Sequence, residues 1–196
     1  MPVRTVTIAV KRPGGVLANT VAAARADLLV LPQRSERPPE ASDGALAHEM
    51  GGLAEAHALA LCYTYREACS GLEHHALQLV QADGRATANY RSTHLSQAAI
   101  ASGLTPGSWL TTARLEPRGL QPKALQEARM AEQPPSTEAP LVLGLLAGID
   151  HLAPEVARAL SALGADLLIA VVDADQRCAP DLLQPLARLR AIENNV

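Results

Sequence analysis

The thiols of this sequence, which are its strongest candidate nucleophiles, belong to three cysteines. Cys62 lies in a stretch with the pattern of a β-strand, where a free cysteine is usually a small buried apolar residue. Cys69 and Cys178 fall in predicted loops, and no histidine, lysine or arginine is placed by a motif to activate either thiol. An odd number of cysteines without metal-type spacing is typical of reduced thiols. We therefore expect no thiol chemistry from these residues.

The histidines are the candidate acids and bases. His74 and His75 are neighbours on a predicted strand, so their side chains point to opposite faces and do not share a metal ion. His94 is expected to hold its own loop by hydrogen bonds. His151, next to Asp150, is the residue that we would test for proton transfer. The sequence predicts no metal site and no cofactor.

These residues are distributed over alternating strand and helix patterns. Strands are predicted at residues 3–10, 27–32, 58–63, 141–146 and 166–172, and apolar stripes mark helices at Leu17, Val21 and Ala24, at Met50, Leu53, Ala54 and His57, and at Val156, Leu160 and Leu163. Residues 78–80 and 86–90 flank Asp83-Gly84, which predicts an antiparallel hairpin. Such alternation favours the α/β class.

Length and charge limit the classes of function. A chain of 196 residues that is 48% hydrophobic is long enough for one domain, residues 1–196, in which the proline-rich and charged segment 116–140 is a predicted surface insertion. The net charge is -3 and charges of both signs are interspersed, so the sequence predicts no basic surface for nucleic acid. No apolar run approaches the ~20 residues of a membrane span, and no signal peptide is visible. We expect a cytoplasmic protein.

Six segments of the sequence, in order, resemble motifs of the nitrilase superfamily of carbon–nitrogen hydrolases. They are Ala26-Asp27-Leu28-Leu29-Val30-Leu31-Pro32, the hairpin Ala82-Asp83-Gly84-Arg85, Tyr90-Arg91-Ser92-Thr93-His94-Leu95, Thr105-Pro106-Gly107, Gly148-Ile149-Asp150 with the helix start Pro154-Glu155, and Arg190-Ala191-Ile192-Glu193-Asn194. The resemblance implies an α-β-β-α sandwich. Full-length members continue for several strands after the last motif, so it also implies that C-terminal strands are missing.

The resemblance places the three catalytic side chains of the family as well. The family glutamate falls on Gln33, the lysine on Ser92 and the cysteine on Gly148. Glutamine has no basic oxygen, serine supplies no positive charge to an oxyanion, and glycine cannot form a thioester. We therefore expect that the parent reaction is lost. The possible pocket around these positions consists of Gln33, Ser92, His94, Gly148, Asp150 and His151.

Three functions remain open at this point. The first is an inactive homologue that acts by binding or assembly, or that has no selected role. The second is an active hydrolase of a small amide or nitrile that uses residues foreign to the family. The third is a binding module in which Gln33 and Ser92 hold a small amide or carboxylate by hydrogen bonds.

Assembly is expected, as a homo-oligomer or as a hetero-oligomer with a longer homologue. An incomplete sheet would leave a strand edge and apolar faces uncovered. The surfaces of interest are the stripe Val156, Leu160 and Leu163 and the stripe Leu182, Leu186 and Leu189, although either stripe could simply cover its own sheet.

Overall fold

The computed structural model describes residues 8–10, 26–31, 38–116, 140–172 and 180–196, which form two β-sheets and the helices that cover them. The first sheet has the strand order β1 (Ile8–Val10), β2 (Leu28–Leu31), β3 (Ala60–Cys69), β4 (Leu72–Val80) and β5 (Ala86–Arg91). Within it β1, β2 and β3 are parallel, and β4 and β5 continue as antiparallel neighbours. The second sheet has the order β6 (Thr112–Leu115), β7 (Leu141–Ala147) and β8 (Leu167–Val171).

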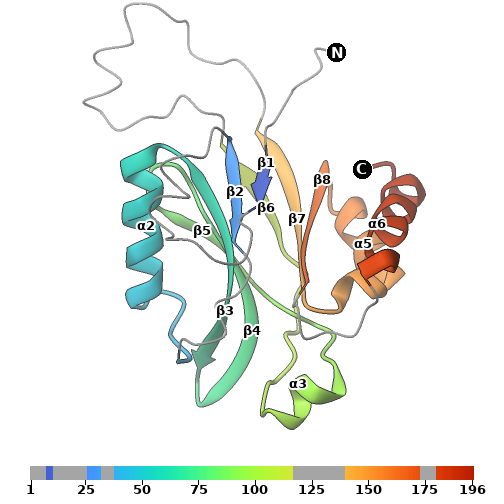
Figure 1. Cartoon of the computed structure of the whole chain (residues 1–196), viewed down its shortest axis with the longest axis horizontal. Coiled ribbons are helices and arrows are strands. Elements are labelled where there is room, and N and C mark those ends of the chain that lie inside the picture. The colour runs from blue at the N-terminus through green and yellow to red at the C-terminus, as the bar shows by residue number, and fades with distance from the viewer. Residues whose placement is uncertain (1–7, 11–25, 32–37, 117–139, 173–179) are drawn as a thin grey trace, which may run out of the picture.

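The helices lie on the outer faces of the two sheets (Figure 1). Helix α2 (Ala45–His57) covers the first sheet, and α5 (Pro154–Ala162) and α6 (Pro180–Asn194) lie on the side of the second. Two short elements follow strand ends, namely α3 (Gln97–Ala101) after β5 and the 3-10 turn η1 (Asp150–Leu152) after β7. No helix in the described ranges has both the length and the apolar character that crossing a bilayer requires.

The main core lies between the sheets, because alternate residues of each strand point inward. Leu28 and Val30 of β2 meet Leu143 and Leu145 of β7 there. The residues between them point outward, so Leu29 and Leu31 pack with Met50 and Ala54 of α2. On the other side Leu146 packs with Val156 and Leu160 of α5. The result is an α-β-β-α sandwich, which confirms the predicted fold.

Most of the predicted elements are confirmed, with differences at their ends. The hairpin turns at Gly84, whose φ of 83° suits glycine, and α5 begins at Pro154 as predicted. Leu163, assigned to the apolar stripe of α5, is 58% exposed, because the helix ends at Ala162 and Leu163 is its C-terminal cap rather than part of its buried face. Strand β3 runs to Cys69, beyond its predicted end at residue 63, because its second half pairs with β4.

Several predictions fall outside the described residues. These are Gln33 and Cys178, the helix predicted from Leu17, Val21 and Ala24, the first part of the first strand, and residues 117–139 of the predicted insertion. Each of them stays a prediction.

Candidate functional site

The motif Tyr90–Leu95 begins in strand β5 and continues into the loop after it, where the ends of the two sheets meet. Alternation along the strand turns Tyr90 toward the space between the sheets and Arg91 toward the opposite face. The chain then leaves the strand, and Ser92 is 1% exposed. The amide of Ser92 still donates to the carbonyl of His75 at 2.9 Å, which fixes the start of the loop.

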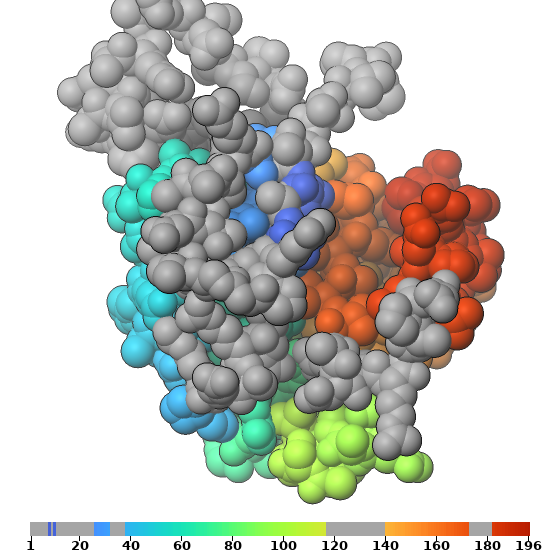
Figure 2. Space-filling model, in the orientation of Figure 1, coloured from blue at the N-terminus to red at the C-terminus, as the bar shows by residue number. Residues whose placement is uncertain are grey.

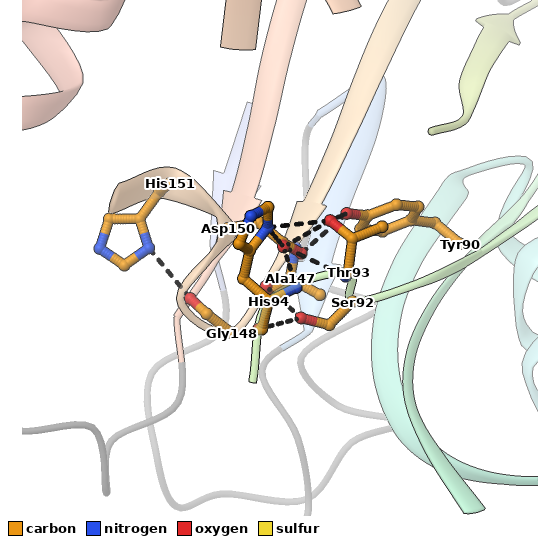
Figure 3. Close-up of polar contacts among 8 residues, drawn as sticks. All are labelled: Tyr90, Ser92, Thr93, His94, Ala147, Gly148, Asp150 and His151. Atoms are coloured by element: carbon orange, nitrogen blue, oxygen red, sulfur yellow. Dashed lines mark hydrogen bonds and ion pairs between the residues drawn. The ribbon is translucent and has the colours of Figure 1, made fainter. Parts of the chain in front are cut away.

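Asp150 is the centre of a hydrogen-bonded cluster between the two sheets (Figure 3). The residue is 0% exposed. Its Oδ1 atom accepts from the amides of Thr93 at 3.1 Å and His94 at 2.8 Å, from the hydroxyl of Thr93 at 3.0 Å, and lies 3.1 Å from Nδ1 of His94. Its Oδ2 atom accepts from the hydroxyl of Tyr90 at 2.8 Å. A buried carboxylate with so many donors is fully satisfied, and it ties the loop after β5 to the end of β7.

The phenol of Tyr90 acts in this cluster as a fixed donor. Burial, together with the negative charge of Asp150, raises the pKa of Tyr90 above its ordinary value. The phenol is therefore protonated at neutral pH and donates its hydrogen to the carboxylate.

Ser92 faces the residue that precedes Gly148. Its hydroxyl lies 2.9 Å from the carbonyl oxygen of His94 and 3.1 Å from that of Ala147. A hydroxyl has one hydrogen to donate, so these two carbonyls compete for it. The hydroxyl of Ser92 is therefore used by the backbone, either of its own loop at His94 or of the end of β7 at Ala147.

Gly148 occupies a sharp turn directly after β7. Its φ is 61°, in the left-handed region that glycine adopts without steric cost, and its amide donates to the carbonyl of Val171 at 3.0 Å. The short turn η1 and then α5 follow it. This strand-turn-helix geometry would present a side chain at position 148 at the end of the sheet, where glycine has none.

The histidines of the predicted pocket point in different directions. The side chain of His94 belongs to the Asp150 cluster and is 42% exposed. His151 is turned away from that cluster, as Figure 3 shows, and its Nδ1 lies 3.0 Å from the carbonyl oxygen of Gly148. The structure therefore brings Ser92, His94 and Asp150 together beside Gly148 and directs His151 elsewhere.

An ion pair with a buried carboxylate anchors the motif from the other face of the first sheet. Arg91 donates to Glu67 through two nitrogens, at 2.7 Å and 2.9 Å. Burial alone would raise the pKa of Glu67, but hydrogen bonds from Arg91 and Asn89 and the charge of Arg91 outweigh it, so the pKa is lowered. The carboxylate is ionised at neutral pH, and its ion pair ties β5 to β3 across β4.

Neither thiol in the described residues takes part in the hydrogen bonds around Asp150. Cys62 is fully buried in the main core, and burial raises the pKa of its thiol to about 12. The expectation of a small buried residue is confirmed. Cys69 is not in a loop, as predicted, but at the end of β3. Among the described residues no group of three metal-ligating side chains gathers at one place.

Sequence reasoning did not identify all the partners of these residues. Tyr90 and Thr93 belong to the motif Tyr90–Leu95, and Asp150, the carboxylate that they share, belongs to the motif that starts at Gly148, so the two motifs together indicate the cluster. Nothing in the sequence around Glu67 indicates its role, because its pairing with Arg91 depends on the register of three strands.

Comparisons with known proteins agree with this architecture. The model of the carbon-nitrogen hydrolase family matches residues 16–196. A search of curated protein sequences found no match to the chain.

Solved structures with a similar fold include amidases of Nesterenkonia. A cysteine-to-alanine variant of the Nesterenkonia AN1 amidase from the nitrilase superfamily has a TM-score of 0.66 and 21% identity, over 92% of this chain and 65% of that one. The same variant in complex with butyramide gives the same values, with 66% of that chain covered. A glutamate-to-glutamine variant, with an acetamide moiety added covalently at its active-site cysteine, has a TM-score of 0.66 and 21% identity over 92% and 65%. The chain thus spans about two thirds of the length of these structures.

Proposed function

This chain belongs to the carbon–nitrogen hydrolase family, and we propose that it does not perform the family reaction and acts instead by binding or assembly in the cytoplasm. One observation carries the proposal. The hydroxyl of Ser92, at the position that the resemblance assigns to the family lysine, is hydrogen-bonded to the carbonyl of Ala147, next to Gly148 at the assigned cysteine position. Among the described residues, neither a thiol nor a cationic side chain hydrogen-bonds to this pair of positions.

The structurally similar Nesterenkonia amidase illustrates what a glycine at the cysteine position removes. In that protein the active-site cysteine carries the covalent adduct. A glycine in its place has no side chain that could form the corresponding bond. The described thiols offer no replacement, since Cys62 is fully buried between the sheets. Both described cysteines are free, which supports the cytoplasmic assignment.

A binding role is compatible with what remains of the site. The resemblance places Gln33 beside Ser92 and Gly148, and an amide side chain can both donate and accept hydrogen bonds. The site would then hold a small amide or carboxylate without reacting with it. Thermal stabilisation by butyramide or butyrate, measured together with ammonia release, separates binding from turnover.

A second candidate function is a hydrolase that uses residues foreign to the family. The observation that favours it is the pairing of a partly exposed His94 with the buried carboxylate of Asp150, at 3.1 Å. A histidine oriented by a carboxylate can act as a general base toward a water molecule. His94→Gln is the variant that tests this candidate.

We expect no release of ammonia from acetamide, propionamide or butyramide above the rate without protein. The reason is the absence of a side chain at position 148. The measurement is a coupled ammonia assay with an active amidase of the superfamily as the positive control. Turnover that scales with the amount of protein, survives purification and resists thiol-blocking reagents would contradict the proposal. If it also disappeared in His94→Gln, the second candidate would take its place.

Assembly is proposed to use the exposed face of α6. Leu182, Leu189 and Ile192 are 55%, 46% and 81% exposed. Their spacing of seven and three residues places them on one side of the helix. The stripe on α5 is different, because Val156 and Leu160 are buried against their own sheet. The α6 face is therefore the surface that a second copy, or a longer homologue, would cover.

We expect light scattering after size-exclusion chromatography to give a mass above the 20.6 kDa of the single chain at tens of micromolar. The double variant Leu189→Glu with Ile192→Glu should return the species to monomer mass, because charges on the face oppose its burial. Leu72→Glu, a change at an exposed leucine of β4, is the matched control and should leave the mass unchanged. A monomer in the unmodified protein at that concentration would rule out self-assembly.

A further inference from the structure

An apolar cavity of about 510 Å³ runs along the edge of the second sheet, between β1 and α6. Every residue from Leu167 to Val172 lines it, so the cavity follows the whole of β8 rather than one face of the strand. In Figure 2 the orange surface around β8 is visible between the blue of β1 and the red of α6. Within the described ranges no strand pairs with β8 on this side.

The backbone of β8 presents hydrogen-bonding groups to this cavity. The amide of Gly148, directly after β7, donates to the carbonyl of Val171 at 3.0 Å, so the backbone groups of Val171 point toward β7. Successive residues of a strand direct their N–H and C=O groups to opposite sides. Those of Leu168 and Ala170 therefore point away from β7, toward the cavity. A sheet edge of this kind is a template for pairing with a further strand.

The layers on the two sides of the cavity extend beyond β8. In the first sheet Val10 of β1 is in register with Val30 of β2 and lies on the same inner face, yet Val10 is 64% exposed and Val30 only 6%. In the helical layer α6 directs one face at the cavity, and no residue of this face is buried. The face consists of Leu183, Leu186, Ala187, Arg190 and Ala191. The sandwich thus has room for one more strand beside β8.

The walls of the cavity determine which strand fits. The first sheet would cover one face of such a strand and α6 the other, so its side chains must be apolar at successive positions. The lining is apolar except for His151 and Arg190, and Arg190 is paired with Glu193 at 2.8 Å. A charged segment would lose its hydration there without gaining a partner. Strand β8 of a second copy does not fit, because the β1 and α6 of that copy would collide with the walls.

We propose that this cavity is a docking site for an uncharged, extended segment of another polypeptide, which joins the second sheet as a strand next to β8. The backbone of the segment bonds to the N–H and C=O groups of Leu168 and Ala170. Its side chains alternate between the inner face of β1 and the facing side of α6. The assembly proposed above uses a different face of α6, so this proposal goes beyond that function and does not depend on it.

The test uses a synthetic peptide with five consecutive valine, leucine and isoleucine residues, flanked by lysine pairs for solubility and labelled for fluorescence anisotropy. Two further peptides carry N-methyl groups, one on the first, third and fifth core amides and the other on the second and fourth. Only one of these two sets of amides can point toward β8. We expect the unmodified peptide to bind the full chain, and one methylated peptide to bind at least about tenfold more weakly than the other, because it loses strand pairing.

Equal affinities of the two methylated peptides would overturn the proposal, since apolar contact alone does not distinguish them. An unmodified peptide that does not bind up to its solubility limit would overturn it as well. Hydrogen exchange supplies a measurement on the same complex. The amides of Leu168 and Ala170 should exchange at least about tenfold more slowly when the peptide is bound, and exchange at an unchanged rate would contradict pairing with β8.

A variant that fills the cavity tests the location of the peptide. Ala187 lines the cavity from α6 and is exposed, so Ala187→Phe blocks the cavity without crowding the core. Peptide binding should be lost in this variant. Ala56→Phe, the same change at an exposed position of α2 on the other side of the molecule, should bind the peptide like the unmodified protein. Binding that persists in Ala187→Phe would show that the peptide docks elsewhere.

Discussion

Replacing Asp150 with alanine is expected to lower the free energy of unfolding by about 4 kcal/mol. The carboxylate is fully buried and accepts from Tyr90, Thr93 and His94, and all of these donors would lose their partner at once. Each buried donor left without an acceptor costs about 1–3 kcal/mol, although water that enters the space recovers part of it. The measurement is urea-induced unfolding followed by circular dichroism. The comparison requires that the free energy of unfolding falls with urea concentration at the same slope in both proteins.

Asp166→Ala is the matched control for this variant. Asp166 is exposed and accepts from the amide of Val142 at 2.9 Å, so its replacement should cost at most about 1 kcal/mol. If both variants lost the same small amount, the Asp150 cluster would not hold the sheets together in solution.

Gly107→Ala is expected to cost about 3 kcal/mol. A Cβ atom at this position would collide with the carbonyl oxygen of Arg91 and lie 2.6 Å from the Cβ of that residue. The loop would have to move away, and the 2.7 Å hydrogen bond from the amide of Gly107 to the carbonyl of Ser92 would break. The close approach explains why a glycine follows Pro106 in this motif. Thermal unfolding and the same urea titration measure the loss.

Gly52→Ala provides the opposite control. Gly52 lies within α2 and is exposed, and, apart from its chain neighbours and the backbone of the same helix, no atom lies within 4 Å of the position that a Cβ would take. Alanine there should raise the free energy of unfolding by up to about 1 kcal/mol, because glycine is unfavourable inside a helix. A Gly107→Ala variant as stable as the unmodified protein would show that the loop tolerates a side chain, and that the contact with Arg91 is not a constraint.

The patterns of the sequence predict the sandwich because they report burial. The run Leu28–Leu31 is apolar at every position, as a strand covered on both faces must be, and the structure buries all four residues. The helix beginning at Pro154 and the hairpin turn at Gly84 depend on a few neighbouring residues, so they too could be predicted.

Features that depend on tertiary contacts could not be predicted in the same way. The direction of the His151 ring is set by a carbonyl in the turn after β7, and Glu67 meets Arg91 only because β3, β4 and β5 pair in one register. The exposure of Leu163 follows from where α5 ends, which the apolar spacing does not determine. The motifs named Ser92, His94 and Asp150, which the structure gathers near Gly148, but they did not predict that Ser92 would bind the backbone of Ala147.

The Asp150 cluster also determines when this region can form during folding. Its bonds join residues 57 positions apart, and closing so long a segment of chain costs conformational entropy that local contacts do not repay. The hairpin of β4 and β5 can form early from near neighbours, whereas the loop after β5 acquires its partner only once β7 has docked. Completion of the cluster therefore marks the joining of the two sheets, and a chain in which they have not yet met carries a carboxylate that is still hydrated.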